Sequence, residues 1–322
     1  MIVTVTPNPA LDLTWSVPRV DHGATHRVAA GSVRAGGKGL NVARVLHGQR
    51  IGVLAVSTAG GDTGIEFAAE LAASGVPHRL IGVAAPTRRS IAIHDDERDE
   101  TSVFNEFGAS PTGREWDAVL DATATATAQA SCLVIAGSLP PGSPDDLVSQ
   151  LVGLARTAGI PSIVDTSGAG LIAAAEAGAS VVKPNRDELV AATGEADVHT
   201  AAMALLDAGA RAVLLSLGPD GLVLLRGDAP SRSLWARLPQ AIAGNATGAG
   251  DAAVAATAAA LTGSDLVDTG HRLLRMATAW SAAAVLMPLA GEISPQHEVI
   301  AEQVVISDTP AALLSRWTGE ER

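Results

Sequence analysis

Near its C-terminal end the chain reads Gly244-Asn245-Ala246-Thr247-Gly248-Ala249-Gly250-Asp251 and then continues as an alanine-rich run. Glycines let the backbone turn sharply, and the first turn of a helix leaves N–H groups unpaired and partly positive. The amides of Ala249–Asp251 are therefore a candidate anion site. The alanine-rich run after them predicts a tightly packed helix over Ala249–Leu261.

A carboxylate at position 251 would repel an anion held by these amides, so Asp251 needs a different role beside them. Proton abstraction from a substrate hydroxyl is such a role, as in other phosphoryl-transfer sites. The pattern also fits an ordinary loop with Asp251 as the helix N-cap. It is not a Walker A loop, because Gly-Lys-Ser/Thr does not follow the glycines, and it lies far from the first strand, where a dinucleotide-binding turn would stand.

Outside this stretch, short β-branched runs alternate with longer Ala/Leu segments of helical period. The alternation is typical of βαβ units around a mostly parallel sheet, which predicts an α/β fold. The predicted strands cover residues 2–6, 51–57, 133–136, 161–165, 180–183, 212–217 and 222–225. The predicted helices cover residues 39–46, 63–73, 114–128, 144–157, 186–192, 200–208, 249–261 and 269–286.

Two segments, residues 13–34 and 92–107, depart from this alternation and combine polar alternation with charged tips. They predict strands of a small second sheet outside the main one. Such a sheet would lie as a lid over the C-terminal ends of the parallel strands, where ligands bind in open α/β folds. We expect all 322 residues to form a single α/β domain that carries this lid.

Composition narrows the class of protein. The net charge is −12 and the 22 Lys and Arg residues are dispersed, which argues against nucleic acid as a partner. No stretch approaches the roughly 20 uninterrupted apolar residues that a membrane span needs, and the N-terminus does not resemble a signal peptide, so we expect a cytoplasmic protein without a membrane partner. Cys132, the single cysteine, cannot form an intramolecular disulfide.

Taken in order, the motifs resemble those of the ribokinase/PfkB family of sugar kinases over nearly the whole chain. Residues 245–251 resemble the second signature of the family, and residues 36–43 resemble the first. Blocks similar to the phosphosugar branch of the family occupy residues 6–12, 60–64, 87–88, 137–142, 165–168, 183–189 and 216–221. The resemblance implies a three-layer fold, with helices on both faces of the central sheet and a small β-sheet lid.

The resemblance also implies roles at the phosphoryl-transfer end. Asp251 would be the general base, and Gly248, Ala249 and Gly250 would form the anion hole. Asn185 and Glu188 match an Asn-x-x-Glu motif that places Mg²⁺ largely through water, which suits an ion that needs one or two carboxylates besides nucleotide phosphates. A helix start after Pro184, with Glu188 in its first turn, also explains this pair, and both explanations can hold together.

For the nucleotide, Ser216, Gly218 and Gly221 resemble an ATP-binding turn between two adjacent strands, although Pro-Asp-Gly is also a common turn. Lys183 is a candidate for the ATP phosphates, and its alternative is an exposed lysine at a strand end. ATP and Mg²⁺ are therefore the implied cofactors.

At the sugar end, Asp12 is placed to accept hydrogen bonds from sugar hydroxyls, or else serves the turn itself. Gly36 and Gly37 allow the backbone to approach a sugar closely, and Asn41 points back from the first helical turn. Lys38 departs from the wider family. A cation is costly to bury unless an anion pairs with it, so Lys38 predicts a substrate that is already phosphorylated.

Arg88 can grip a phosphate bidentately and supports the same prediction. Ser138 is a candidate to donate a hydrogen bond to the phosphate or the sugar. Its alternative is a purely structural role in its own turn. Whether Arg27 and Glu106 contact the substrate is left open. Arg27 could equally be a surface charge.

With these residues in place, the resemblance implies ATP-dependent phosphorylation of a ketohexose phosphate. The blocks that contain Asp12 and Lys38 resemble those of 1-phosphofructokinases, which convert fructose 1-phosphate to fructose 1,6-bisphosphate. Tagatose-6-phosphate kinase and 6-phosphofructokinase activity are the alternatives within the family. From other classes, we weigh a non-catalytic sensor of nucleotides or sugar phosphates and a dinucleotide-dependent dehydrogenase, which the absence of Gly-x-Gly-x-x-Gly after the first strand disfavours. Exposed lid strands predict a homodimer.

Overall fold

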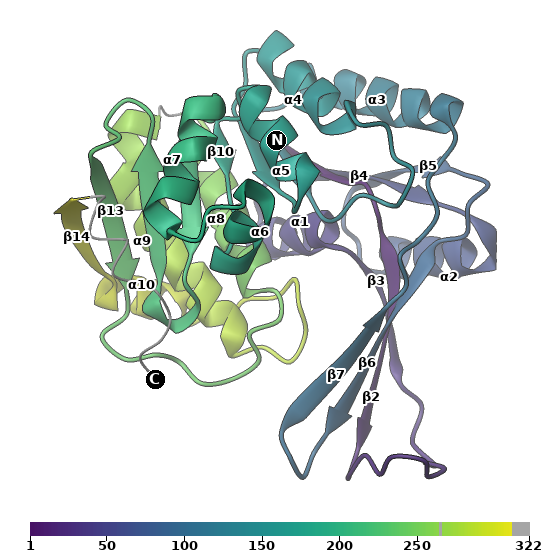
Figure 1. The fold of residues 1–322 in the computed structure, drawn as a ribbon. Helices are drawn as coiled ribbons and strands as arrows, with labels where there is room; N and C mark the ends of the chain where they lie inside the picture. The colour runs from purple at the N-terminus through teal and green to yellow at the C-terminus, as the bar shows by residue number, and fades with distance from the viewer. Residues whose placement is uncertain (264–265, 311–322) are drawn as a thin grey trace.

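A computed structural model describes residues 1–263 and 266–310, and its largest element is a ten-stranded sheet (Figure 1). The strand order is β14-β13-β12-β11-β10-β9-β8-β1-β4-β5. Neighbours from β5 to β11 pair in parallel, and β12, β13 and β14 add antiparallel pairs. The strands are β1 (Ile2–Thr6), β4 (Val53–Ala59), β5 (His78–Gly82), β8 (Cys132–Ala136), β9 (Ser162–Asp165), β10 (Val181–Val182), β11 (Ala212–Ser216), β12 (Leu222–Arg226), β13 (Arg232–Arg237) and β14 (Val305–Pro310).

Helices cover both faces of this sheet and bury its side chains in two separate clusters. One face carries α1 (Lys38–Gly48), α2 (Gly61–Ala73), α8 (Ala249–Leu261), α9 (Leu266–Val285) and α10 (His297–Gln303). The other carries α3 (Gly113–Thr127), α4 (Leu147–Thr157), α5 (Ala169–Glu176), α6 (Arg186–Thr193) and α7 (Val198–Ala208). The three-layer α/β fold is therefore confirmed.

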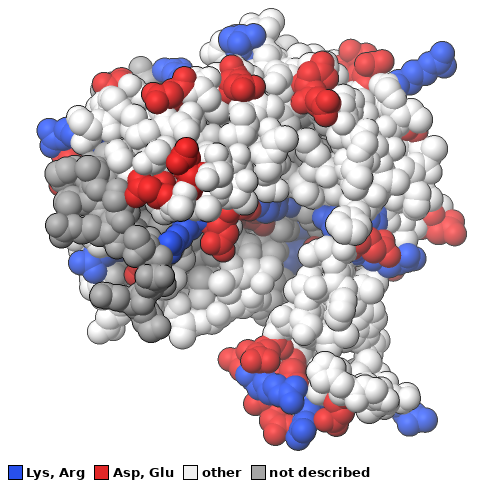
Figure 2. Space-filling view, viewed as in Figure 1, with Lys and Arg blue, Asp and Glu red and all other residues white. Residues whose placement is uncertain are grey.

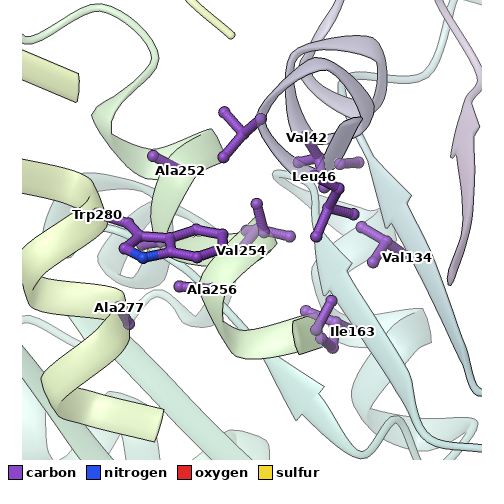
Figure 3. Close-up of a cluster of buried hydrophobic side chains, with 14 of the residues drawn as sticks. Val42, Leu46, Val134, Ile163, Ala252, Val254, Ala256, Ala277 and Trp280 are labelled. Carbon is purple, nitrogen blue, oxygen red and sulfur yellow. The ribbon is translucent and has the colours of Figure 1, made fainter. Parts of the chain in front are cut away.

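Alternation along each strand explains the two clusters. In β8, Val134 packs into one cluster and its neighbours Leu133 and Ile135 into the other, because successive side chains point to opposite faces. Figure 3 shows the first cluster, where Leu46 of α1 lies beside Val134, and Val254 of α8 lies between Leu46 and Trp280 of α9. Helices α1 and α8 thus lie together on one face of the sheet, and this packing brings their N-terminal residues into contact.

The predicted second sheet is present and projects from the main body (Figure 1). Its order is β3-β2-β6-β7, formed by β2 (Ala10–Val17), β3 (Ser32–Gly36), β6 (Arg88–Asp95) and β7 (Glu100–Asn105). The starts predicted for its two segments were too late in the chain, because β2 begins at Ala10 and β6 at Arg88, and the first segment ended two residues before β3 does. Ala10 and Leu11 are buried where this sheet joins the body, so the polar alternation used for the prediction is absent there. Figure 2 shows the predicted charged groups at its far tip.

Other elements differ little from prediction. The eight predicted helices and seven predicted strands are all present, with bounds shifted by a few residues at most. Elements that the sequence pattern did not reveal include α5, α10, β5, β13 and β14. Cys132 is buried in β8, as expected of a residue that packs in a strand. The predicted single domain includes residues 264–265 and 311–322, which lie outside the described ranges. Across the helices that are described, none combines the length and apolar character that a membrane span requires.

Candidate functional site

The start of α8 has the open backbone amides that the glycine-rich stretch predicted. Its N-cap is Gly248, with a left-handed φ of 84°, and a Cβ there would lie 2.8 Å from the Cα of Ala290. No described side chain caps the helix, so the N–H groups of Gly250 and Asp251 face outward without one. The amide of Ala249 differs from expectation, because it donates to the carbonyl of Ala246 at 3.2 Å. Asp251 itself lies in the first turn, so the alternative that makes it the N-cap is wrong.

The Asp251 carboxyl group is buried, with 6% of the residue exposed. The Nδ2 of Asn41, from α1, donates a hydrogen bond to its Oδ2 at 2.8 Å. Burial, and next the negative charge of Asp165, raise the pKa of Asp251 to about 7, against the opposing influence of Asn41, Lys38 and Lys183. A carboxyl group with such a pKa can accept a proton near neutral pH.

Two lysines converge on Asp165, the last residue of β9. Lys38 Nζ lies 3.0 Å from its Oδ1, and Lys183 Nζ lies 3.4 Å from its Oδ2. Burial alone would raise the pKa of Asp165, but the two lysines more than offset this and hold it below the usual value. Lys183 is 3% exposed, so the alternative of an exposed lysine at a strand end is wrong.

Lys38 requires a correction. Its ammonium group also lies 3.3 Å from Oε1 of Glu188, so two carboxylates of the chain already neutralise it. Burial would lower the pKa of Lys38, but Asp165 and then Glu188 reverse this and raise it above the ordinary value. The Lys38 side chain is also 38% exposed, so its position does not require a phosphorylated substrate, contrary to the argument drawn from the sequence.

Asn185 and Glu188 form a capping box at the start of α6. The Asn185 side chain accepts a hydrogen bond from the Glu188 amide at 2.8 Å, and Oε2 of Glu188 accepts one from the Asn185 amide at 2.9 Å. The helix-start explanation of this motif is therefore correct. It does not exclude a second role, because the other carboxylate oxygen of Glu188, which lies beside the partly exposed Lys38, takes no part in the capping box.

The predicted turn between adjacent strands joins β11 to the antiparallel β12. Ser216 ends β11, and its amide donates to the carbonyl of Pro184 at 3.0 Å, which places the turn beside Asn185. Gly218 and Gly221 both have positive φ, and a Cβ on Gly221 would lie 2.1 Å from the Ala236 carbonyl oxygen. The candidate nucleotide residues thus lie side by side.

The sugar end is built on the junction between the two sheets. A Cβ on Gly36 would lie 1.9 Å from Oδ2 of Asp12, so only glycine permits this close approach. Burial raises the pKa of Asp12 to about 6, and Arg88, Arg34 and Arg44 oppose the shift. Asp12 therefore lies among positive charges beside the backbone that leads into α1.

Arg88 is held at the base of β6 by main-chain carbonyls. Its Nε and Nη2 donate to the carbonyl of Asn8 at 3.3 Å, and its Nη1 donates to that of Glu106 at 3.1 Å. The side chain of Asn8 in turn donates to Ser138 Oγ at 3.2 Å. Arg88 and Ser138 are thus brought together through Asn8, whereas Lys38 lies with the acidic residues near Asp251.

Residues 36–41 connect the two ends of the site. Gly36 lies against Asp12, Lys38 pairs with Asp165 and Glu188, and Asn41 bonds to Asp251. Candidate sugar-binding and phosphoryl-transfer groups therefore meet at the N-terminus of α1.

Sequence reasoning did not select Asp165, Asn8, Arg34 or Arg44. Asp165 had a detectable signal, since it ends a predicted strand at the edge where ligands bind in open α/β sheets. Asn8 stood in a quoted motif without a role. The two arginines had no local signal, because what distinguishes them is their closeness to Asp12 in space.

Comparisons with known proteins agree with this arrangement. The model of the pfkB family carbohydrate kinases matches residues 8–297. The 1-phosphofructokinase of Xanthomonas campestris pv. campestris is 36% identical over 96% of this chain and 98% of its own. The ATP-dependent 6-phosphofructokinase isozyme 2 of Mycobacterium tuberculosis is 36% identical over 89% of this chain and 84% of its own.

A solved structure extends the likeness to three dimensions. The tetrameric inhibited form of phosphofructokinase-2 from Escherichia coli superposes with a TM-score of 0.82 at 30% identity. The match covers 98% of this chain and 99% of that one. With the family model, the curated relatives and this fold in agreement, the chain belongs to the pfkB family of carbohydrate kinases.

Proposed function

We propose that this protein transfers the terminal phosphoryl group of ATP to the free primary hydroxyl of a ketohexose phosphate. Fructose 1-phosphate is the proposed substrate and fructose 1,6-bisphosphate the product. The observation that carries the proposal is the set of contacts of residues 36–41, which link Asp12 to Asp251. A sugar held at Asp12 would present a hydroxyl toward the carboxyl group at the start of α8.

In this proposal Asp251 accepts the proton of the attacking hydroxyl. The pKa of about 7 keeps a large share of this carboxyl group ionised at neutral pH. The outward-facing amides of Gly250 and Asp251, the turn at Gly248 that precedes them and the partial positive charge of the helix start stabilise the charge on the transferring group. Most of the catalytic work is then positioning and charge stabilisation, as expected for phosphoryl transfer.

The nucleotide is assigned to the side of the α8 N-terminus that faces Lys183, opposite the proposed sugar site. Lys183 contacts its phosphates, and the turn with Ser216, Gly218 and Gly221 receives the rest of the molecule. Support comes from Gly250, where a Cβ would be 3.5 Å from Lys183 Nζ, so this ammonium group borders the helix start.

Magnesium is assigned to Glu188 and Asn185, largely through water. Within the described ranges no three His, Cys, Asp or Glu side chains assemble into a metal site. That fits Mg²⁺, which keeps several waters and takes further oxygens from nucleotide phosphates. When bound, the ion would neutralise charge on those phosphates.

For the sugar phosphate, Asp12 is proposed to accept hydrogen bonds from the sugar hydroxyls. The sugar would then lie against the backbone of Gly36 and Gly37, with Asn41 nearby. Arg88 is the proposed phosphate contact, because Asn8 bonds to its guanidinium through the main-chain carbonyl and to Ser138 through the side chain, so the two polar groups lie near one another. Lys38 is proposed to approach the sugar from the Asp251 side, and its role as a phosphate contact now rests only on the resemblance of its block to those of 1-phosphofructokinases.

Phosphorylation of fructose 6-phosphate is the main alternative, since relatives named for either activity are equally identical to this chain. Tagatose 6-phosphate is a further one. The experiment measures ADP release from ATP with each of fructose 1-phosphate, fructose 6-phosphate and tagatose 6-phosphate at matched concentrations. We expect kcat/KM to be highest with fructose 1-phosphate. A higher value with either 6-phosphate would overturn the choice of substrate, and no release with any of them would favour a non-catalytic sensor.

We also propose a homodimer formed through the small sheet, in the cytoplasm where ATP is supplied. Strand β7 lies at the edge of that sheet, and Val103 and Phe104 on it are 53% and 61% exposed. Apolar side chains on an open sheet edge favour pairing with a second chain. Light scattering on wild type and Phe104→Lys tests the proposal, since the variant is expected to lower the measured mass to that of a monomer.

A further inference from the structure

Asp165 holds a position that the proposed mechanism does not use. Its carboxylate ends β9 in the middle of the large sheet, and 1% of the residue is exposed. Each of its two oxygens pairs with a different lysine, Lys38 at 3.0 Å and Lys183 at 3.4 Å. With a lysine on each oxygen and 1% of the residue exposed, Asp165 is enclosed by its own chain.

The two lysines belong to different parts of the site. Lys38 begins α1, three residues before the Asn41 that bonds to Asp251. Lys183 follows β10, and its ammonium group borders Gly250 at the start of α8. Asp165 thus stands between a cation on the sugar side and a cation on the nucleotide side.

The lysines depend on Asp165 unequally. Lys38 has Glu188 as a second carboxylate partner at 3.3 Å. For Lys183, Asp165 is the sole ion-pair partner found within residues 1–263 and 266–310. A buried ammonium group that loses its carboxylate must move, recruit water or lose its charge. Removal of Asp165 should therefore displace Lys183 more than Lys38.

We infer that Asp165 is a positioning residue for phosphoryl transfer, which fixes Lys183 against the start of α8 for the nucleotide phosphates and Lys38 for the sugar. This inference rests on the proposed function, because it assumes that the two lysines face those ligands. Asp165 itself touches neither ligand. A purely structural carboxylate would instead stabilise the fold without a particular effect on nucleotide affinity.

A double-mutant cycle separates these roles. The cycle compares wild type, Asp165→Asn, Lys183→Met and the double variant, with the ATP dissociation constant, KM for ATP, KM for the sugar phosphate and Tm measured for each. We expect Asp165→Asn to weaken ATP binding about tenfold in the wild-type background and less than about twofold in the Lys183→Met background, a coupling within the range known for contacting residues. We expect a smaller rise in KM for the sugar phosphate, because Glu188 still holds Lys38.

The same loss of ATP affinity in both backgrounds would overturn the inference, because Asp165 would then act without Lys183. If Asp165→Asn does not fold, Asp165→Glu keeps the charge and moves it by one methylene group. That variant is expected to fold, as shown by a cooperative thermal transition, and to weaken ATP binding, and wild-type affinity for ATP in it would also contradict the inference.

The control is Asp197→Asn at the N-cap of α7, where the aspartate accepts a hydrogen bond from the Thr200 amide at 2.8 Å. It makes the same chemical change outside the site and should leave ATP affinity unaltered. Direct measurement of ATP binding also keeps the two proposals distinct. If none of the sugar phosphates is a substrate, the proposed function fails, whereas the cycle on ATP affinity still decides the role of Asp165.

Discussion

Strands β8 and β7 show how differently the two sheets of this protein are built. All five residues of β8 in the large sheet are buried, whereas all six residues of β7 in the small sheet are exposed. Asp165, Lys183 and Asp251 are attached to the buried part. The small sheet contributes Asp12 and Arg88, both near its junction with the large one. Groups assigned to the chemical step thus lie on rigid elements, and groups assigned to the sugar lie where an exposed element could move when ligands bind.

The largest effect is expected at the buried end, from Asp251→Asn. The amide keeps the shape of the side chain but cannot accept the hydroxyl proton, so kcat should fall about 10²- to 10⁴-fold. Steady-state kinetics test this, with ATP binding and circular dichroism expected to stay as in wild type. Near-normal kcat would remove Asp251 from its role as base.

The contrast in burial predicts unequal costs for the same truncation in the two sheets. Ile135→Ala in β8 removes a side chain that is 1% exposed and should lower the free energy of unfolding by about 2–5 kcal/mol. Ile91→Ala in β6 removes a partly exposed side chain and should cost clearly less. Urea denaturation of both variants makes the comparison, and equal losses would mean that the small sheet is as tightly packed as the large one.

The contact between α1 and α8 predicts a pH effect. Asn41 donates a hydrogen bond to the ionised Asp251 and so lowers its pKa, while burial, the largest influence, raises it to about 7. Asn41→Ala should raise that pKa further. The acidic limb of kcat against pH, where the protonated base is inactive, should then move to higher pH.

A matched control for this profile is Thr257→Ala. Thr257 is a buried polar residue of the same helix, and its hydroxyl donates to the Ala253 carbonyl away from Asp251. The control should keep the wild-type midpoint. A midpoint in Asn41→Ala that stays at the wild-type value would show that the hydrogen bond does not tune the base.

The smallest effect is expected where the two regions meet at the surface. Arg34 in β3 pairs with Glu292, in the loop after α9, at 3.2 Å. The side chain of Glu292 is 39% exposed, so Glu292→Gln should cost less than about 1 kcal/mol of unfolding free energy. Urea denaturation again measures it, and a loss as large as that of Ile135→Ala would show that this pair holds the regions together.

Local pattern predicted the helix of Asp251 most accurately. Helix α8 covers Ala249–Leu261, as expected, because glycines before it and alanines within it act on the neighbouring backbone. Helix α5 was missed because its segment, Ala169–Glu176, is apolar nearly throughout and has no helical alternation. Strand β14 was missed because its pairing with β13 joins segments about 70 residues apart.

The same distinction between local pattern and long-range packing applies to the candidate site. The glycine-rich turn, the capping box of Asn185 and Glu188, and the turn before β12 are arrangements of near neighbours, and the sequence by itself determined them. The tertiary structure alone decided which charges meet: residues 38, 165, 183 and 188 converge only because the start of α1 and the start of α6 come together at the C-terminal ends of the neighbouring strands β9 and β10. Burial of apolar side chains sets that order, and no local spacing of charged residues encodes it.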